Sequence, residues 1–355
     1  MITIQQLLKA VVKQNASDLH LIAGSPPILR VNGRVVRVKT EELSGEDTRK
    51  LCYSIITDVQ KSKFEEQKEL DFSFGIKNMA RFRANFFFQK GFVSGVFRRV
   101  ALEIPSVSSL GLPQAAIDVT NFNAGLVLVT GPTGSGKSTT IASLLDKINQ
   151  ERRGHIITLE DPIEYIHQHK NCIINQREVG SDTEDFLIAL KSLLRQDPDV
   201  CLIGELRDNE TVEATMKVAE TGHLVFGTLH TNTAIQSISR IVGMFPSEQR
   251  ERARMQLSEV LNAVITQKLL PSRDGGMVAA CELMILTPNI RHLIRENKLH
   301  QAYGLMQVGQ EKTGMVTMNQ SLLKLIMNRK INVKVAFSAT PDPEELDQLM
   351  EKAGL

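Results

Sequence analysis

The sequence lacks the features that mark several large classes of protein. Its four cysteines are far apart and form no C-x-x-C pair, so we expect neither a disulfide framework nor a zinc site. It contains no run of about 18 or more apolar residues, and the N-terminus shows no signal peptide. These absences predict a cytoplasmic protein that would be peripheral at a membrane only through partners.

The chain also lacks the composition of a nucleic-acid-binding protein. Lys plus Arg number 42 and Asp plus Glu 40, so the net charge is only +2. Aromatic residues make up 5% of the chain and tryptophan is absent, which leaves few side chains for base stacking. We therefore expect no nucleic acid among its partners. What the chain does have is 42% apolar residues over 355 positions, enough for about two globular domains.

Residues 1–100 are expected to form a small α+β domain. The stretch 3–14 repeats apolar residues at helical spacing and predicts a helix. Further on, Ile28–Val31 and Arg34–Val38 flank Asn32-Gly33, the strongest short signal for a β-hairpin.

A later strand of this domain carries two arginines. In Met79–Phe88, Arg81 and Arg83 alternate with apolar residues, which puts both arginines on one face. As phosphate-binding residues they would have to reach a ligand from outside the core fold, and a solvated strand face is the simpler alternative. Residues 101–113, with prolines and serines, are the expected linker.

The remainder of the chain predicts an α/β core over residues 114–285 and a helical region over 286–355. Short apolar strands alternate with helical patterns, as in a parallel sheet with helices on both faces. The stretch 247–270 is predicted to be helical. The expected strands are Leu126–Thr130, His155–Leu159, Val200–Ile203 and Leu224–Leu229.

A glycine-rich loop follows the first of these strands and has the P-loop spacing G-x-x-x-x-G-K-S. Its glycines let successive N–H groups face phosphate oxygens, while Lys137 would contact the β/γ-phosphates and Ser138 would bind Mg²⁺. A strand precedes the loop and a helical pattern follows it, as the motif requires. The nucleotide-binding residues predicted here are Gly131, Pro132, Thr133, Gly134, Ser135, Gly136, Lys137, Ser138 and Thr139.

Acidic residues follow two other strands. Glu205 comes after Val200–Ile203, at the edge of a parallel sheet where ligands bind, and is the best candidate for a general base. Glu160, Asp161 and Glu164 follow another strand and favour a metal or water site, with a solvated turn as the alternative.

Histidines and arginines accompany these acids. His223 and His230 stand at the two ends of the last strand, where a lone histidine is more often structural. Arg195 and Arg207 flank the Glu205 strand and could serve a neighbouring subunit, or simply be charged surface.

Four segments, in this order, resemble the type II/type IV pilus secretion ATPases: Gly131–Thr139, Leu159–Glu164, Gly204–Asp208 and Thr221–Thr231. The resemblance covers nearly the whole length. It implies a RecA-like P-loop ATPase core preceded by a small PAS-like α+β domain, assembled as a homohexamer that uses ATP and Mg²⁺. The reaction implied is hydrolysis of ATP to ADP and phosphate.

The resemblance also implies roles for single residues. Glu205, Glu164 and His230 would be catalytic, and Ser138 and Glu164 would hold Mg²⁺, partly through water. The further nucleotide-binding residues that it implies are Glu160, Asp161, His223, Arg81, Arg83 and Arg98.

Two absences favour the retraction branch of this family, whose members drive twitching motility. Assembly-type relatives carry a further N-terminal domain and a four-cysteine zinc module, and this sequence shows neither. The expected partner is an inner-membrane pilus platform protein. Asn289 stands where retraction members commonly have alanine, so an accessory retraction ATPase that works beside a paralogue is one alternative. A type II secretion or pilus assembly ATPase is the other.

Overall fold

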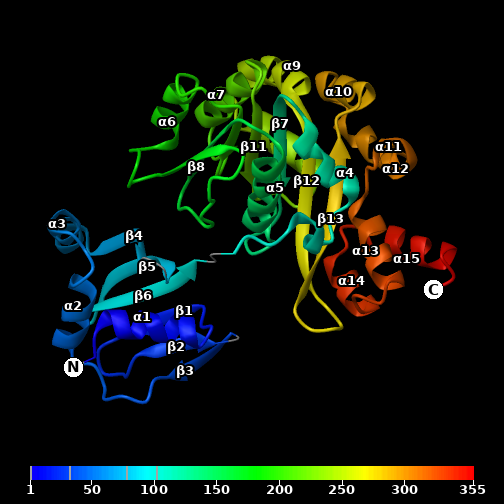
Figure 1. The fold of residues 1–355 in the computed structure, drawn as a ribbon. Coiled ribbons are helices and arrows are strands. Elements are labelled where there is room, and N and C mark those ends of the chain that lie inside the picture. Colours follow the sequence, from blue (N-terminus) through cyan, green and yellow to red (C-terminus); the bar gives the residue numbers. More distant parts are fainter. Residues whose placement is uncertain (1, 32, 77–78, 101–102) are drawn as a thin grey trace. The chain divides into compact units, whose positions relative to one another are not determined.

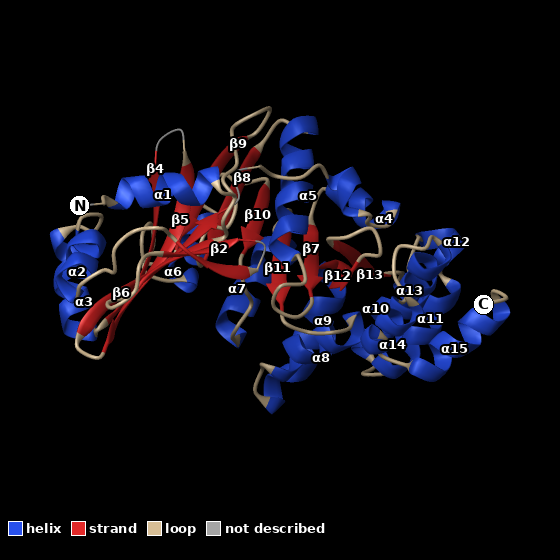
Figure 2. Ribbon diagram, turned by 90° about the horizontal axis from the view of Figure 1, so that it is seen from below, coloured by secondary structure: helices blue, strands red, loops and turns tan. Residues whose placement is uncertain are grey.

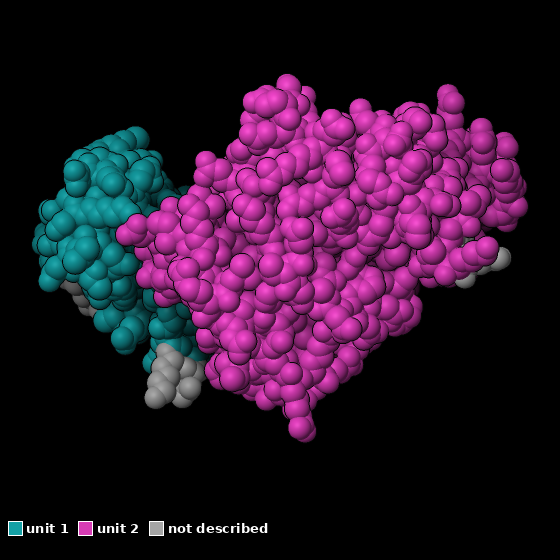
Figure 3. Space-filling view, turned by 90° about the horizontal axis from the view of Figure 1, so that it is seen from above, with its two compact units in different colours: residues 1–103 teal, residues 104–355 magenta. Residues whose placement is uncertain are grey.

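The computed structural model describes residues 2–31, 33–76, 79–100 and 103–355. The chain forms two compact units, Met1–Glu103 and Ile104–Leu355, which are coloured separately in Figure 3.

The described residues of the first unit form a six-stranded antiparallel sheet, in the order β3-β2-β1-β6-β5-β4, and three helices. The predicted helix at 3–14 is confirmed, and Thr3 and Gln6 cap its start reciprocally. The predicted hairpin is confirmed by the pairing of Val31 with Arg34, while Asn32 lies outside the described residues. The elements are α1 (Ile4–Lys13), β1 (Asp18–Leu21), β2 (Ile28–Val31), β3 (Arg34–Arg37), α2 (Gly45–Tyr53), α3 (Asp58–Gln67), β4 (Glu69–Ile76), β5 (Ala80–Gln89) and β6 (Phe92–Val100).

Strand β5 has one buried face and one polar face, as its alternation predicts. Phe82, Ala84 and Phe86 are fully buried in the core of the unit. Arg81 is half-buried and Arg83 exposed on the opposite face.

The second unit is built on a seven-stranded sheet, in the order β13-β12-β7-β11-β10-β8-β9 (Figure 1). All neighbours are parallel except β12 and β13. The strands are β7 (Gly125–Thr130), β8 (His155–Glu160), β9 (Ile173–Glu178), β10 (Val200–Ile203), β11 (Leu224–Leu229), β12 (Leu261–Pro271) and β13 (Met277–Ile285). The helices are α4 (Gln114–Ile117), α5 (Lys137–Glu151), α6 (Phe186–Leu193), α7 (Asn209–Glu220), α8 (Ala234–Gly243) and α9 (Arg250–Val260).

Helices cover both faces of this sheet, which explains why its central strands β7, β10 and β11 are buried along their whole length. On β7, Leu126 and Leu128 pack into the core formed with α6 to α9, whereas Val127 and Val129 pack against α5. Figure 2 shows α5 on one side of the strands and α8 and α9 on the other.

The predicted helix over 247–270 is wrong in its second half. Helix α9 ends at Val260, and the chain continues as β12, which pairs with the central strand β7. Periodicity alone does not distinguish a fully buried strand from a buried helix. The apolar run after Val260 was therefore predicted to be a helix, although it forms a strand. The edge strand β9 and helix α8 were also not predicted.

Residues 286–355 are largely helical, as predicted. The helices are α10 (Pro288–Arg295), α11 (Ala302–Val308), α12 (Gln310–Thr313), α13 (Met318–Met327), α14 (Val333–Ala339) and α15 (Pro343–Lys352). The last three share a small core with Leu270 of β12 and Ala280 of β13. Within the described ranges, none of the helices is long and apolar enough to cross a bilayer.

Candidate active site

The predicted site segments meet at one edge of the sheet because their strands are parallel. In the register, Leu229 pairs with Thr130. Ile203 pairs with Gly227 on one side and with Leu159 on the other. The segments that follow β7, β8, β10 and β11 therefore lie side by side at the carboxyl edge.

The glycine-rich loop after β7 needs its first glycine. Gly131 has a φ of 142°, and a Cβ there would overlap the backbone carbonyl of Gln267 on β12. The loop ends at Gly136, the N-cap of α5, so the first N–H groups of that helix have no acceptors within it. The start of a helix with free N–H groups is suited to bind an anion.

Lys137 is folded back over this loop. Its Nζ donates hydrogen bonds to the carbonyls of Gly131, at 2.9 Å, and Pro132, at 3.1 Å. Burial lowers the pKa of Lys137, while the nearby carboxylates of Glu164 and Glu205 act in the opposite direction. The ammonium group is thus partly desolvated, with two acids close enough to affect its charge.

The position of Glu205 is fixed by the backbone on both sides of it. Gly204 donates its N–H to Leu159 of β8 at 2.7 Å, and Leu206 donates to Thr228 of β11 at 3.1 Å. The hydroxyl of Thr228 also donates to the carbonyl of Gly204. Glu205 is therefore held between two strands at the site edge.

The Glu205 carboxylate has two charged or chargeable neighbours. Arg207 Nε donates to Oε2 at 2.7 Å, and His230 Nε2 lies 3.4 Å from Oε1. Arg207 also lies 3.5 Å from Asp161, and its hydrogen bond to Glu205 raises the pKa of the guanidinium. The structure thus brings Glu205, His230 and Asp161 together, and adds Arg207 as the residue that joins them.

Glu160 has a different environment from the other acids. Its carboxylate accepts hydrogen bonds from Thr158 at 2.6 Å and from Gln176 at 3.2 Å. Burial raises the pKa of Glu160, although these hydrogen bonds oppose the rise. The side chain is engaged with strands β8 and β9, so its direct contact with a nucleotide stays a prediction.

Two residues of β9 hold the segment that follows β8. The carboxylate of Glu178 accepts from the N–H of Ile163 at 3.1 Å, and Gln176 accepts from the N–H of His167 at 2.8 Å. Neither residue was predicted from the sequence, because strand β9 was not predicted. These residues are two positions apart, which puts both on one face of a strand. This spacing is the signal in the sequence that could have identified them.

His223 lies apart from the other predicted site residues, so its contact with a nucleotide stays a prediction. It precedes β11, and its backbone carbonyl accepts from Gly125 at the start of β7, so it lies at the amino edge of the sheet. Its Nδ1 lies 3.0 Å from the carbonyl of Val218. A strand the length of β11 spans roughly 17 Å, so His223 does not reach the loop of its own chain. Only His230 stands at the site edge.

The predicted magnesium ligands come from two segments. Ser138 lies in the first turn of α5, and Glu164 is close enough to Lys137 to affect its charge. Among the residues that the structure describes, no group of three or more His, Cys, Asp or Glu could hold a metal by itself. Mg²⁺ commonly keeps several waters and takes phosphate oxygens, so a hydroxyl and a carboxylate fit an ion that binds together with phosphates.

The three arginines of the first unit that were predicted to bind phosphates already have partners there. Arg98 donates to Asp18 at 2.8 Å, Arg83 lies 3.7 Å from Asp71, and Arg81 is bonded to Ser73. Burial would raise the pKa of Asp18, but hydrogen bonds from Arg98 and Ser17 hold it below the usual value. Contact of these arginines with phosphates stays a prediction.

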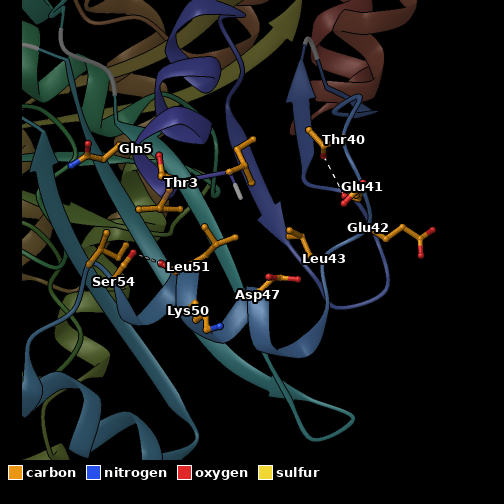
Figure 4. A pocket seen from close by; sticks show the side chains of 13 residues that line it. Thr3, Gln5, Thr40, Glu41, Glu42, Leu43, Asp47, Lys50, Leu51 and Ser54 are labelled. Carbon is orange, nitrogen blue, oxygen red and sulfur yellow. Dashed lines mark hydrogen bonds between the residues drawn. The ribbon is translucent and has the colours of Figure 1, made fainter.

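The first unit also has a cavity of about 630 Å³ between the start of α1, residues 40–43 and α2 (Figure 4). Several of its polar groups are satisfied locally: the Asp47 carboxylate caps α2, and the hydroxyl of Ser54 donates to Leu51. None of the predicted site residues lines it.

Comparison with known proteins supports a single family. The model of the family described as "Type II/IV secretion system protein" matches residues 1–349. The chain is 47% identical over 341 residues to "Type IV pilus retractation ATPase PilT" of Pseudomonas aeruginosa, covering 96% of this chain and 99% of that protein. It is 43% identical over 345 residues to "Twitching motility protein" of Neisseria gonorrhoeae, covering 97% and 92%. A structure described as "Crystal Structure of the Pilus Retraction Motor PilT and Bound ADP" superposes with a TM-score of 0.93 at 51% identity, covering 98% of this chain and 100% of that one.

Proposed function

The chain belongs to the type II/IV secretion system protein family, and we propose that it is an ATPase motor that powers type IV pilus retraction and hence twitching motility. The names of its relatives, a retraction ATPase and a twitching motility protein, support this task over assembly or secretion. The observation that carries the enzymatic part is the convergence of the glycine-rich loop, Lys137 and Glu205 at one sheet edge.

Phosphates would bind at the start of α5, in a RecA-like core. The Nζ of Lys137, which donates to Gly131 and Pro132, would exchange those carbonyls for phosphate oxygens. A related motor crystallised with ADP supports a nucleotide as the ligand. When bound, Mg²⁺ would neutralise charge on the phosphate oxygens, and Ser138 and Glu164 are the residues that would hold it.

Glu205 would orient the attacking water as general base. In the structure one of its oxygens accepts from Arg207, so Arg207 must move or share that oxygen before a water can be bound. His230, 3.4 Å from the other oxygen, would keep the carboxylate oriented, and Asp161 offers Arg207 an alternative partner.

The motor function requires several subunits and a partner. We propose a homohexamer in which Arg81, Arg83 and Arg98 add positive charge to the phosphates, so that binding and release of nucleotide move the PAS-like domain. At the cytoplasmic side of the inner membrane, this movement would act on a pilus platform protein, alone or beside a paralogous ATPase.

Steady-state ATPase assays of Glu205→Gln test the proposal. We expect retained ATP binding and a turnover lower by roughly 100-fold or more. Glu210→Gln, which changes an exposed acid on α7, is the matched control and should turn over normally. Wild-type turnover in Glu205→Gln would remove Glu205 from this role. In cells, deletion should leave pili on the surface without retraction, whereas loss of pili would indicate assembly.

A further inference from the structure

Three neighbouring strands of the second unit carry buried polar residues in a row, on the face of the sheet that α8 covers. Thr130 of β7 pairs with Thr266 of β12, and Thr266 pairs with Glu282 of β13. The exposed fraction is 0% for both threonines and 2% for Glu282. Earlier on the same face, Leu128 and Val264 belong to the apolar core under α6 to α9. Polar side chains in such a place are unfavourable unless they are hydrogen-bonded.

Glu282 is the acceptor for the first N–H group of α8. Its Oε1 accepts from the N–H of Ala234 at 2.6 Å, in a buried hydrogen bond. The side chain of Thr233, the N-cap of α8, accepts from Gln236 instead. The first N–H groups of a helix have no acceptor within it, and Ala234 is fully buried. Glu282 therefore supplies the acceptor that this buried helix start requires.

The start of α13 holds the Glu282 side chain in turn. The N–H of Met318, the first residue of α13, donates to the same carboxylate. The next residue of β13, Leu283, exchanges two backbone hydrogen bonds with Val316, at 2.8 and 3.1 Å. The chain that leads into α13 is thus bound to β13 directly beside Glu282. One carboxylate joins the starts of two helices, and the two donors fix its orientation.

The start of α8 fixes the segment that carries His230. The Thr231 hydroxyl lies 2.6 Å from the hydroxyl of Ser237, and Ser237 donates to the carbonyl of Thr233 at 2.8 Å. The hydroxyl of Ser237 also lies 3.4 Å from that of Thr130, the residue before the glycine-rich loop. The segment after β11 is therefore bound to α8, and α8 is bound to the end of β7.

We propose that Glu282 is a positioning residue of the active site, which sets the place of His230 beside Glu205 through α8. The inference rests on the proposed ATPase function, because His230 has its role there. The contacts run from α13 through Glu282 to α8 and then to the site edge. A displacement of the C-terminal helices at α13 would therefore change the distance between His230 and Glu205, which is 3.4 Å.

Steady-state ATPase assays of Glu282→Met test the assignment. Methionine has a similar length but accepts from neither N–H group, so His230 should be displaced by a fraction of an ångström. We expect a kcat lower by about tenfold and an unchanged KM for ATP. Glu282→Gln keeps one carbonyl oxygen as an acceptor, so its kcat should be lower by only about threefold. The glutamine variant carries the test if the methionine variant does not fold.

Repeating both changes in a His230→Ala background separates positioning from a purely structural role. Because Glu282 acts through His230, neither change should lower kcat further in that background. Thr287→Ala is the matched control, since it removes the N-cap of α10, which follows the same strand β13. It should lower the melting temperature and leave kcat at the wild-type value.

Other outcomes would overturn the assignment. A wild-type kcat in Glu282→Met would do so, as would a wild-type kcat in Glu282→Gln if the methionine variant does not fold. Equal losses of kcat with and without His230 would show that Glu282 acts only on the fold. In each of these cases a wild type that hydrolyses ATP leaves the ATPase proposal intact. A wild type without turnover would sink the ATPase proposal and the role of Glu282 with it.

Discussion

Replacing Gly204 by alanine tests whether the backbone on both sides of Glu205 sets the catalytic rate. A Cβ at Gly204 would lie 3.0 Å from the carbonyl oxygen of Leu159 and 3.2 Å from the Cα of Glu160, both backbone atoms of the β8 end. These contacts are short enough that the segment must shift by a few tenths of an ångström. The N–H bond to Leu159 and the hydroxyl bond from Thr228 resist that shift.

The size of the effect follows from this geometry. Added volume in a packed environment costs about 1–3 kcal/mol of stability, so the protein should remain folded with a lower melting temperature. A displacement of about 1 Å in an active site can cost about 100-fold in rate, so a smaller shift of Glu205 predicts a kcat lower by about tenfold. ATP affinity should change little, because the loop is on another strand.

Gly243→Ala is the matched control, since a Cβ there meets nothing within 4 Å. On α8 this change should stabilise the protein by up to about 1 kcal/mol and leave kcat unchanged. Turnover at constant enzyme concentration and thermal melting are measured for both variants. A wild-type kcat in Gly204→Ala would contradict this prediction, because Glu205 would then tolerate the shift.

Three further predictions concern the histidines, a buried acid and a helix cap. His230→Ala should lower kcat in ATPase assays, whereas His223→Ala, at the far edge of the sheet, should leave nucleotide affinity unchanged. An unchanged kcat in His230→Ala, or weaker nucleotide binding by His223→Ala, would contradict the placement of these histidines. Burial raises the pKa of Glu282 in the folded protein. The contribution of this group to the free energy of unfolding is therefore largest below its unfolded pKa of about 4.3. That contribution is lost as the pH rises toward the pKa of the folded state. Glu282→Gln should therefore flatten the pH profile of urea unfolding above that pH, and an unchanged profile would argue against a buried carboxylate. Thr3→Ala should lower the free energy of unfolding by about 1 kcal/mol in urea, because it removes the cap of α1, and no change would mean that the cap is not formed.

Local features of the sequence were sufficient to predict most of the helices and strands. The spacing of apolar residues predicted β7, β8, β10 and β11, each short and followed by a glycine, an acid or a histidine. The hairpin of β2 and β3 and the capped start of α1 also depend on neighbouring residues only. The glycine-rich loop could also be predicted locally, because its backbone takes positive φ angles that favour glycine, as at Gly131.

The direction of strand β11 already separates the two histidines in the sequence. Ligands bind at the carboxyl edge of a parallel sheet, and His223 precedes its strand whereas His230 follows it. The family resemblance implies a nucleotide role for both histidines, and the register of β11 on β7 places them at opposite edges of the sheet.

From the sequence we predicted four strands of the second unit, the phosphate loop and the acids that follow neighbouring strands, because each depends on a few adjacent residues. What those residues contact depends on the tertiary structure. Long-range pairing placed β12 beside β7. Strand β9 supplied Gln176, which donates a hydrogen bond to the Glu160 carboxylate, so Glu160 is not a free acid. The tertiary structure also placed Arg207 beside Glu205. These contacts depend on the positions of strands far apart in the chain, which no local pattern specifies.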